Sequence, residues 1–370
     1  MKESEADWQA QLEEYRKEID RIDQKIFELI IKRQRIALKI GEIKRRFGID
    51  IIDPAREKEK LKEFAKKADE SLISYSSLRS IFNEIISASR SVQLPIRVGF
   101  LGPEGTFSHQ AAIALFGNSS VFVPLESIEE VFSEVEKGSC HQGVVPIENS
   151  YEGSVKTTLD MLYKYDLRIN GEVLIRIRHS LLSKEEDIRK IRKIYSHPMA
   201  ISQCKLWIKT NLGNVSIYET QSTAEAAKIV LNEPESAAIG NRLLAEIYGL
   251  RILKHGIEDS PDNITRFLAI GKPGRQIEPT GKDKTSILFF LKDRPGALFR
   301  ALEALAKKKI NMTRIESRPM KTRKWEYLFY VDLEGHEKDP VVNSALKEME
   351  ESCVMLKRLG SYPSADRPWE

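Results

Sequence analysis

A single arginine, Arg33, interrupts an otherwise apolar seam near the start of the chain. Between Tyr15 and Phe47, apolar residues alternate at intervals of three and four positions, which is the spacing of one face of a helix. A guanidinium in such a seam costs on the order of several kcal/mol unless it is paired. Arg33 therefore predicts an internal salt bridge, a side chain that reaches the surface, or a binding site for a small anion.

The seam requires a long helix over residues 8–47, which would extend on the order of 60 Å at 1.5 Å per residue. Two further helices are predicted over 53–67, where Asp-Pro supplies an N-cap and first residue, and over 75–92. These two helices are too short to cover the first. We therefore expect an all-α domain over residues 1–94 whose core is completed by a second copy of the chain, in a homodimer or larger homo-oligomer.

Polar side chains at fixed positions around the seam favour the anion site. The set comprises Arg16, Lys44, Asp53, Arg56, Glu57, Ser89 and Gln93. Together with Arg33, these residues resemble the all-helical chorismate mutases over residues 8–93. Chorismate is a dianion that rearranges in a pericyclic step without a nucleophile, a proton transfer or a metal. Its enzyme must hold the reactive conformer and stabilise charge on the breaking ether oxygen.

The resemblance implies a role for each of these side chains. Arg33 and Arg16 are expected to hold the two substrate carboxylates, with Arg16 supplied by the second subunit. Lys44 and Gln93 are expected to donate hydrogen bonds to the ether oxygen. Contacts to the other substrate groups are expected from Ser89, Asp53, Arg56 and Glu57. Asp53 is equally well explained as the N-cap of the second helix.

Residues 96–272 alternate between strand-like and helical runs, which predicts an α/β domain with helix-covered sheets in two lobes. Within it, residues 102–108 form a strand-to-helix turn that can present backbone N–H groups and hydroxyls to an anion. Three other strings, in 145–150, 196–203 and 262–267, bring polar side chains close to strand ends. Taken singly, each string is also explained by capping or turn residues.

Together these strings resemble prephenate dehydratase over residues 96–271. That reaction expels hydroxide and carbon dioxide as the ring becomes aromatic, so it needs a hydrogen-bond donor and a carboxylate site but no metal. The resemblance implies that Thr265 is the donor and that the substrate is bound by Thr106, Glu148, Asn149, Ser196 and Gln203. Arg266 is expected to partner a substrate carboxylate or to form a structural ion pair. We interpret His179 and His197 as structural.

Residues 284–365 follow the order βαββαβ, which predicts a ferredoxin-like domain. The strings Asp293–Leu298 and Glu316–Pro319 resemble the ACT regulatory domain of phenylalanine-sensitive dehydratases. The resemblance implies phenylalanine as effector, with its carboxylate at the start of a helix and its ammonium at Glu316. The expected effector residues are Gly296, Ala297, Leu298, Glu316, Ser317 and Arg318. A capped helix in a purely structural domain is the alternative.

The composition narrows the class of protein. Lys and Arg number 59 against 55 Asp and Glu, with the two signs interspersed, so a nucleic-acid partner is not expected. Cys140, Cys204 and Cys353 are too widely spaced for a disulfide framework or a zinc site. No apolar run approaches the ~18 residues of a membrane helix. We expect a cytoplasmic protein that uses no metal and no cofactor and does not bind membranes.

The predicted function is therefore the conversion of chorismate to prephenate and of prephenate to phenylpyruvate, with feedback inhibition by phenylalanine. Two alternatives remain open. The middle domain would act on arogenate in one of them, and in the other the chain would be an amino-acid sensor without catalysis. A sensor explains the three-domain organisation, but it explains neither the grouping of Arg33, Lys44 and Gln93 nor Thr265 beside Arg266.

Overall fold

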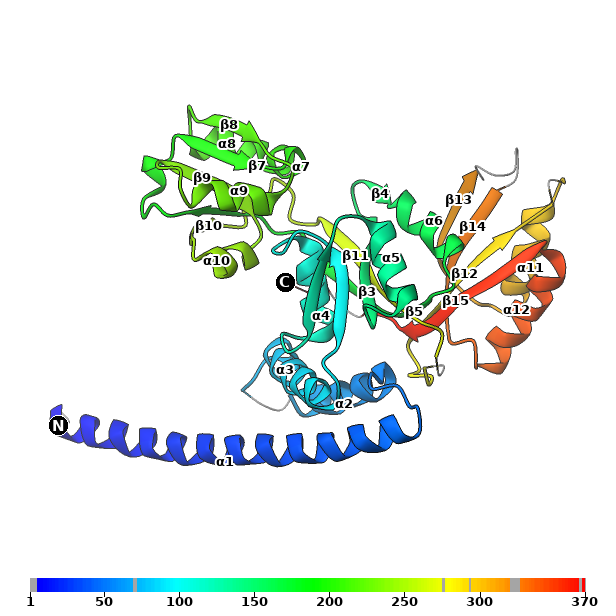
Figure 1. Cartoon of the computed structure of the whole chain (residues 1–370), viewed down its shortest axis with the longest axis horizontal. Coiled ribbons are helices and arrows are strands. Elements are labelled where there is room, and N and C mark those ends of the chain that lie inside the picture. Colours follow the sequence, from blue (N-terminus) through cyan, green and yellow to red (C-terminus); the bar gives the residue numbers. More distant parts are fainter. Residues whose placement is uncertain are drawn as a thin grey trace.

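The computed structural model describes residues 5–68, 72–274, 277–292, 294–319, 327–365 and 368–369. Figure 1 shows three parts in chain order: a helical domain, a two-lobed α/β domain and a C-terminal domain with one sheet and two helices. The predicted fold class is confirmed. Within the described ranges, no helix combines the length and the apolar character that crossing a membrane requires.

The helical domain consists of α1 (Glu5–Arg46), α2 (Pro54–Ala68) and α3 (Tyr75–Gln93). α1 packs against α3 through a stripe of small and polar residues that includes Ala37 and Gly41. At Gly41 the helices are so close that an added Cβ would lie 2.7 Å from Cγ of Gln93. The predicted apolar seam lies beside this stripe and stays open, with Ile36 52% and Ile43 56% exposed.

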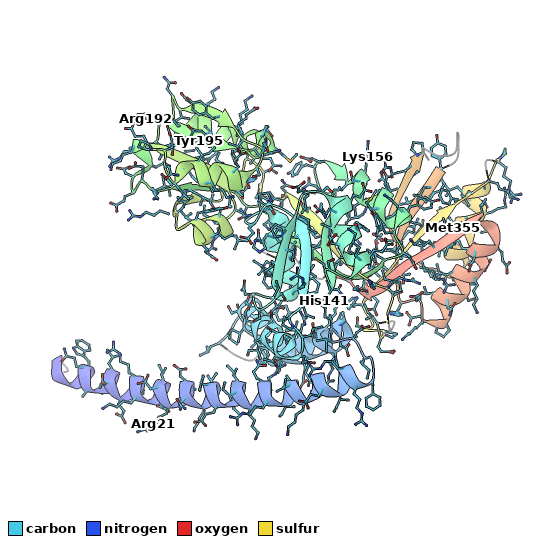
Figure 2. The ribbon with its side chains drawn as sticks, in the orientation of Figure 1. Arg21, His141, Lys156, Arg192, Tyr195 and Met355 are labelled. Carbon is cyan, nitrogen blue, oxygen red and sulfur yellow. The ribbon has the colours of Figure 1, made fainter. Side chains whose placement is uncertain are left out.

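The N-terminal half of α1 extends past α3 without a neighbouring element (Figure 1). Side chains project from both sides of this half, and Arg21 lies on the side turned away from the rest of the chain (Figure 2). The large apolar residues exposed between Trp8 and Leu29 are Trp8, Leu12, Tyr15, Ile19, Ile22, Ile26, Phe27 and Leu29. Apolar area of this kind is stabilised when another surface covers it.

The first lobe of the two-lobed domain contains a mixed sheet in the order β2-β1-β3-β11-β5, with β4 paired to β3. Its strands are β1 (Arg97–Leu101), β2 (Val121–Leu125), β3 (Gln142–Asn149), β4 (Gly153–Ser154), β5 (Arg168–Arg176) and β11 (Ile264–Gly271). α4 (Phe107–Phe116) covers one face, while α5 (Ile128–Lys137) and α6 (Lys156–Lys164) cover the other. The hydroxyls of Thr106 and Ser127 cap α4 and α5.

The second lobe is inserted between β5 and β11, which are neighbours in the first-lobe sheet. Its sheet has the order β10-β6-β9-β7-β8. The strands are β6 (Ser180–Ser183), β7 (Lys193–Ser196), β8 (Ser216–Glu219), β9 (Ser236–Gly240) and β10 (Arg251–His255). The helices are η1 (Ile188–Lys190), α7 (Pro198–Gln203), α8 (Lys205–Asn211), α9 (Thr223–Val230) and α10 (Leu243–Tyr248). The chain therefore enters and leaves the second lobe through two adjacent strands of the first lobe.

Residues 198–211 form two helices, α7 and α8, with a break at Cys204. The reason is a tertiary contact that the local sequence does not contain. The Asp259 carboxylate accepts hydrogen bonds from the backbone N–H groups of Leu206 and Trp207, both at 2.9 Å. A distant carboxylate thus caps α8, in the manner of an N-cap residue.

The C-terminal domain has the predicted βαββαβ order, with the strands arranged β13-β14-β12-β15. Its elements are β12 (Asp283–Phe290), α11 (Ala297–Lys307), β13 (Met312–Pro319), β14 (Tyr327–Glu334), α12 (Pro340–Ser352) and β15 (Met355–Pro363). α11 and α12 cover one face of the sheet. The other face packs on the first lobe, where Leu288, Tyr330 and Tyr362 share one core with Ile147 and Leu268. The two domains therefore share buried apolar contacts.

Candidate active sites

A cavity of about 320 Å³ lies between the two lobes. Four of the residues predicted for the dehydratase reaction line it, namely Thr106, Asn149, Gln203 and Thr265. The second lobe contributes His197, Met199 and the start of α9, while β3 and β11 form the floor of the first lobe. Residues separated by more than 100 positions in the sequence thus surround one space.

Asn149 and Thr265 face each other across β3 and β11, in register. Nδ2 of Asn149 donates to Oγ1 of Thr265 at 2.8 Å and to Oδ1 of Asn263 at 2.7 Å. Oδ1 of Asn149 accepts the backbone N–H groups of Tyr151 at 2.9 Å and Glu152 at 3.1 Å. These contacts fix the amide orientation. Because Thr265 accepts from Asn149, its own hydroxyl hydrogen is left to donate towards the cavity.

The cavity is bordered by the first residues of α4 and α9, which include the capping residues Thr106 and Ser222. Helix N-termini carry partial positive charge and unpaired N–H groups, so both helices favour an anion in this space. The sequence suggested an arginine for that purpose. The lining instead supplies helix N-termini, amide and hydroxyl groups and two histidines, together with one carboxylate, that of Glu152.

His179 lies at this cavity, although its spacing in the sequence predicted no more than a structural role. Nε2 of His179 contacts Oε1 of Gln203 at 2.8 Å, and Nδ1 is buried without a partner among the described residues. Burial lowers the pKa of His179 below its ordinary value, opposed by Gln203 and Glu258. The imidazole is therefore neutral near pH 7 and holds the amide of Gln203 at the cavity.

Arg266 is not among the residues that line the cavity, and it forms buried ion pairs instead, which favours its interpretation as a structural ion pair. Successive residues of a strand face opposite sides of the sheet, and Arg266 follows Thr265 on β11. Its guanidinium donates to Glu172 at 2.6 Å, Asp332 at 2.6 Å, Glu148 at 2.9 Å and the Tyr362 hydroxyl at 3.0 Å. Glu148 pairs with Arg266 and is likewise absent from the lining of the cavity, so its predicted contact with substrate is not supported by this geometry.

The contacts of Arg266 belong to a buried network that connects the first lobe to the C-terminal domain. Lys284 lies 3.0 Å from Glu172, and Arg314 lies 3.2 Å from Glu148. Three cations thus neutralise the three carboxylates Glu148, Glu172 and Asp332. Burial alone would raise the pKa of Asp332, but Arg266 and hydrogen bonds from Ser286 and Tyr330 hold it below its ordinary value.

Ser196 does not lie at the cavity. Its side chain is fully buried, and its hydroxyl donates to the backbone oxygen of Ile239 at 2.7 Å. This hydroxyl therefore joins β7 to β9 inside the second lobe. The predicted contact of Ser196 with substrate is not supported, whereas its sequence neighbour His197 does line the cavity.

In the helical domain, Arg33, Ser89 and Gln93 come together between α1 and α3. The Arg33 guanidinium contacts the Ser89 hydroxyl and the backbone oxygen of Ile85, the latter at 3.2 Å. Nε2 of Gln93 donates to the Ser89 backbone oxygen at 2.9 Å, and its Oε1 is buried without a partner among the described residues. Burial lowers the pKa of Arg33, opposed by Glu57.

The other predicted mutase residues lie at the ends of α1 and α2. Lys44 donates to the backbone oxygen of Ile51 at 2.9 Å, and Asp53 caps α2 by accepting the Arg56 N–H at 3.1 Å. The Arg56 guanidinium pairs with Glu59 at 2.6 Å on the surface, while Glu57 pairs with Arg90.

Arg16 is separate from this group. It precedes Arg33 by 17 positions on the same helix, a distance of about 25 Å at 1.5 Å per residue. Arg16 therefore cannot reach the site of its own chain, whose other members lie further along α1, at the start of α2 and on α3.

In the C-terminal domain, Gly296 precedes α11 with φ +75°, and Ala297 and Leu298 form the first turn of that helix. Glu316 accepts a hydrogen bond from the Ser154 hydroxyl at 2.7 Å, and Arg318 pairs with Asp160 at 2.9 Å. Glu316 and Arg318 thus face the first lobe, whereas α11 covers the opposite face of the sheet. Ser317 is exposed, and Asp293 lies outside the described residues.

Comparisons with known proteins assign all three domains. Residues 15–94 match the family Chorismate mutase type II, residues 98–275 match Prephenate dehydratase, and residues 285–351 match the ACT domain. Over 358 residues the chain is 47% identical to the bifunctional chorismate mutase/prephenate dehydratase of Aquifex aeolicus, covering 96% of this chain and 98% of that protein. The chain belongs to the family of bifunctional chorismate mutase/prephenate dehydratases.

Other relatives of this bifunctional enzyme family share part of its domains. A prephenate dehydratase from Arthrobacter aurescens, solved in complex with L-Phe, is 36% identical with a TM-score of 0.68, over 74% of this chain and 92% of that one. Arogenate dehydratase/prephenate dehydratase 2 of Arabidopsis thaliana is 38% identical over 72% of this chain and 73% of that protein. The chain is thus a mutase and dehydratase with an ACT domain.

Proposed function

We propose that the helical domain converts chorismate to prephenate and that the two-lobed domain converts prephenate to phenylpyruvate. The observation that carries the second assignment is the Asn149–Thr265 pair, which directs a hydroxyl donor into a cavity bordered by two helix N-termini. That combination suits a dianion that must lose a hydroxyl group.

In the dehydratase step, the ring C–O bond breaks and the Thr265 hydroxyl donates a hydrogen bond to the departing oxygen, which leaves as water after taking up a proton. The C–C bond that joins the carboxylate to the ring also breaks. Its electron pair enters the ring, which becomes aromatic, and carbon dioxide leaves. Asn149 and Gln203 hold the substrate, and the starts of α4 and α9 offset its negative charge.

In the mutase step, side chains of this protein hold chorismate in its reactive conformation and stabilise the charge that develops on its ether oxygen. Arg33 and Ser89 bind one carboxylate of chorismate. Lys44 and Gln93 donate to the ether oxygen as its C–O bond lengthens and a new C–C bond forms. The hydroxyl group of chorismate is held by Asp53, Arg56 and Glu57. Arg16 comes from a second copy whose α1 covers the exposed seam, because its own site lies about 25 Å away.

We also propose that phenylalanine binds the C-terminal domain and inhibits the dehydratase step. The L-Phe complex of the Arthrobacter aurescens relative supports this assignment. The amino acid would use the backbone N–H groups at Gly296, Ala297 and Leu298, and Glu316 with its neighbours Ser317 and Arg318. Because these two groups lie on opposite faces of one sheet, the second group comes from a second copy of the domain.

The test is to supply chorismate alone to the full chain and follow phenylpyruvate. Its appearance supports both activities, and no reaction would eliminate catalysis in favour of a sensor. Lys44→Ala should abolish turnover of chorismate while sparing turnover of added prephenate. Parallel assays with arogenate compare the alternative substrate, and a higher kcat/KM for arogenate would replace prephenate in this proposal. Turnover unaffected by phenylalanine would refute the effector assignment.

A further inference from the structure

Arg90 on α3 contacts both the helical domain and the two-lobed domain, although nothing in the sequence drew attention to it. The residue is 6% exposed. Its Nε donates to Oε1 of Glu57 at 2.8 Å, and a terminal nitrogen contacts the other carboxylate oxygen. The remaining terminal nitrogen donates to the backbone oxygen of Phe116 at 3.3 Å, at the end of α4. One guanidinium therefore joins α2 to the first lobe.

The turn after α4 is held against α3 by two more side chains on the same helix face. Glu84, Ser87 and Arg90 are spaced three residues apart, so they lie on one side of α3. The Asn118 backbone and side-chain N–H groups lie 3.2 Å and 3.0 Å from the Glu84 carboxylate. Ser119 N donates to the Ser87 hydroxyl at 3.1 Å. The first lobe thus fixes the same helix turn from which Arg90 extends.

This close approach depends on Gly117, which has φ +72°. A Cβ at that position would lie 2.3 Å from Cβ of Ser87, a distance at which the helix and the turn could not remain in place. The guanidinium of Arg90 also lies 6.0 Å from the centre of the Phe116 ring, within the range of a cation–π interaction. Arg90 is therefore held from the first-lobe side by a carbonyl oxygen and an aromatic ring.

We propose that Arg90 is a positioning residue for the mutase reaction, which fixes the Glu57 carboxylate and is itself fixed by the first lobe. The inference rests on the role proposed above for Glu57 in binding chorismate. A bidentate guanidinium–carboxylate pair restricts both groups to one geometry. A carboxylate has about four acceptor positions, so Glu57 retains capacity for the substrate hydroxyl. The Glu57 side chain is 21% exposed, and its charge opposes the lowering of the Arg33 pKa by burial, which places the carboxylate near the predicted chorismate site.

A purely structural role for Arg90 predicts different kinetics. If Arg90 only attached the two domains, its loss would lower both activities or the stability of both domains together. If Arg90 acts through Glu57, its loss lowers the mutase kcat and leaves prephenate turnover unchanged. The effect also disappears once Glu57 can no longer act. A double-mutant cycle separates these cases, because coupled residues give non-additive effects.

The experiment uses the full chain with Arg90→Gln, Glu57→Gln and the double variant. Arg90→Gln should lower the mutase kcat on the order of 10- to 100-fold, the cost of a misplaced catalytic group, with dehydratase kcat/KM within about twofold. Adding Arg90→Gln to Glu57→Gln should cost less than about twofold more. Multiplied effects, or equal loss of both activities, would overturn the proposal. Arg90→Lys should recover part of the rate, because it keeps the charge.

A second comparison tests the contribution of the first lobe. Asn118→Ala removes a hydrogen bond to Glu84 and should lower the mutase kcat several-fold, although residue 118 belongs to the other catalytic domain. Asn214→Ala, on an exposed loop of the second lobe, is the matched control and should change neither activity. Equal mutase rates in the two variants would contradict anchoring by the first lobe. Loss of mutase activity in Lys44→Ala, but not in Glu57→Gln, would refute the role of Glu57 while retaining the mutase assignment.

Discussion

Replacing Arg266 by methionine tests whether the buried ion network supports the fold or the substrate. Methionine keeps much of the apolar length of the side chain but leaves two cations facing three carboxylates. Glu172 would retain Lys284, and Asp332 would retain the Ser286 hydroxyl, but both would lose their guanidinium partner. Removing one partner of a buried ion pair costs about 3–5 kcal/mol.

Thermal unfolding of the full chain measures this cost. With roughly 2–4 °C per kcal/mol for domains of this size, the transition of the two-lobed and C-terminal domains should fall by on the order of 10 °C. Arg189→Met is the matched control, because Arg189 also pairs with a carboxylate but its side chain is 86% exposed. Exposed pairs contribute little, so this variant should melt close to the parent.

Kinetics at a temperature where the variant is folded separate the two interpretations of Arg266. Loss of a ligand to a substrate carboxylate would raise the KM for prephenate roughly 30-fold or more. An arginine on the opposite face of β11 should leave that KM within about threefold of the parent. A raised KM together with an unchanged melting temperature would refute the reasoning.

Three further predictions follow from the contacts of α1 and His179. Gly41→Ala should lower the mutase rate roughly tenfold and spare prephenate turnover, because the added Cβ would meet Gln93 at 2.7 Å. The double variant Ile19→Lys, Ile22→Lys should sediment as a monomer and lose mutase but not dehydratase activity, whereas an unchanged oligomer would contradict a partner on the seam. His179 has a lowered pKa, so its contribution to stability is complete above about pH 6.5 and decreases as the pH falls towards the lowered pKa. The melting temperature should therefore fall between pH 7.5 and 5.5 by less in His179→Gln than in the parent.

The order of elements in the helical and C-terminal domains could be predicted because their patterns are local. Helical periodicity depends on residues three and four apart, and it identified α1 within a few residues of its bounds, Glu5–Arg46. Periodicity does not reveal which partner covers a helix face. The most apolar stripe of α1 remains open, and α3 instead packs on Ala37 and Gly41, whose small side chains allow close approach.

The candidate dehydratase site was predicted in part, and two of the residues that do not reach the cavity, Arg266 and Glu148, share one cause. Sequence neighbours on a strand point to opposite faces, so Thr265 and Asn149 reach the cavity while Arg266 and Glu148 do not. If residues 264–271 had been assigned to a strand from the sequence, the opposite orientations of Thr265 and Arg266 would have been predicted. His179 could not be found from spacing, because its contacts come from distant parts of the chain: Gln203 lies on a second-lobe helix, and the ring also meets Phe107 of the first lobe.

In each catalytic domain, residues of the candidate site lie next to residues that contact another domain. On β3 and β11, the pair Asn149–Thr265 faces the cavity, and the adjacent pair Glu148–Arg266 holds the C-terminal domain. The same two strands therefore carry both the hydroxyl donor and a contact to the C-terminal sheet. An effector that changed how this sheet packs on the first lobe would act on the strands that hold Thr265, and this would link the ACT domain to the dehydratase site.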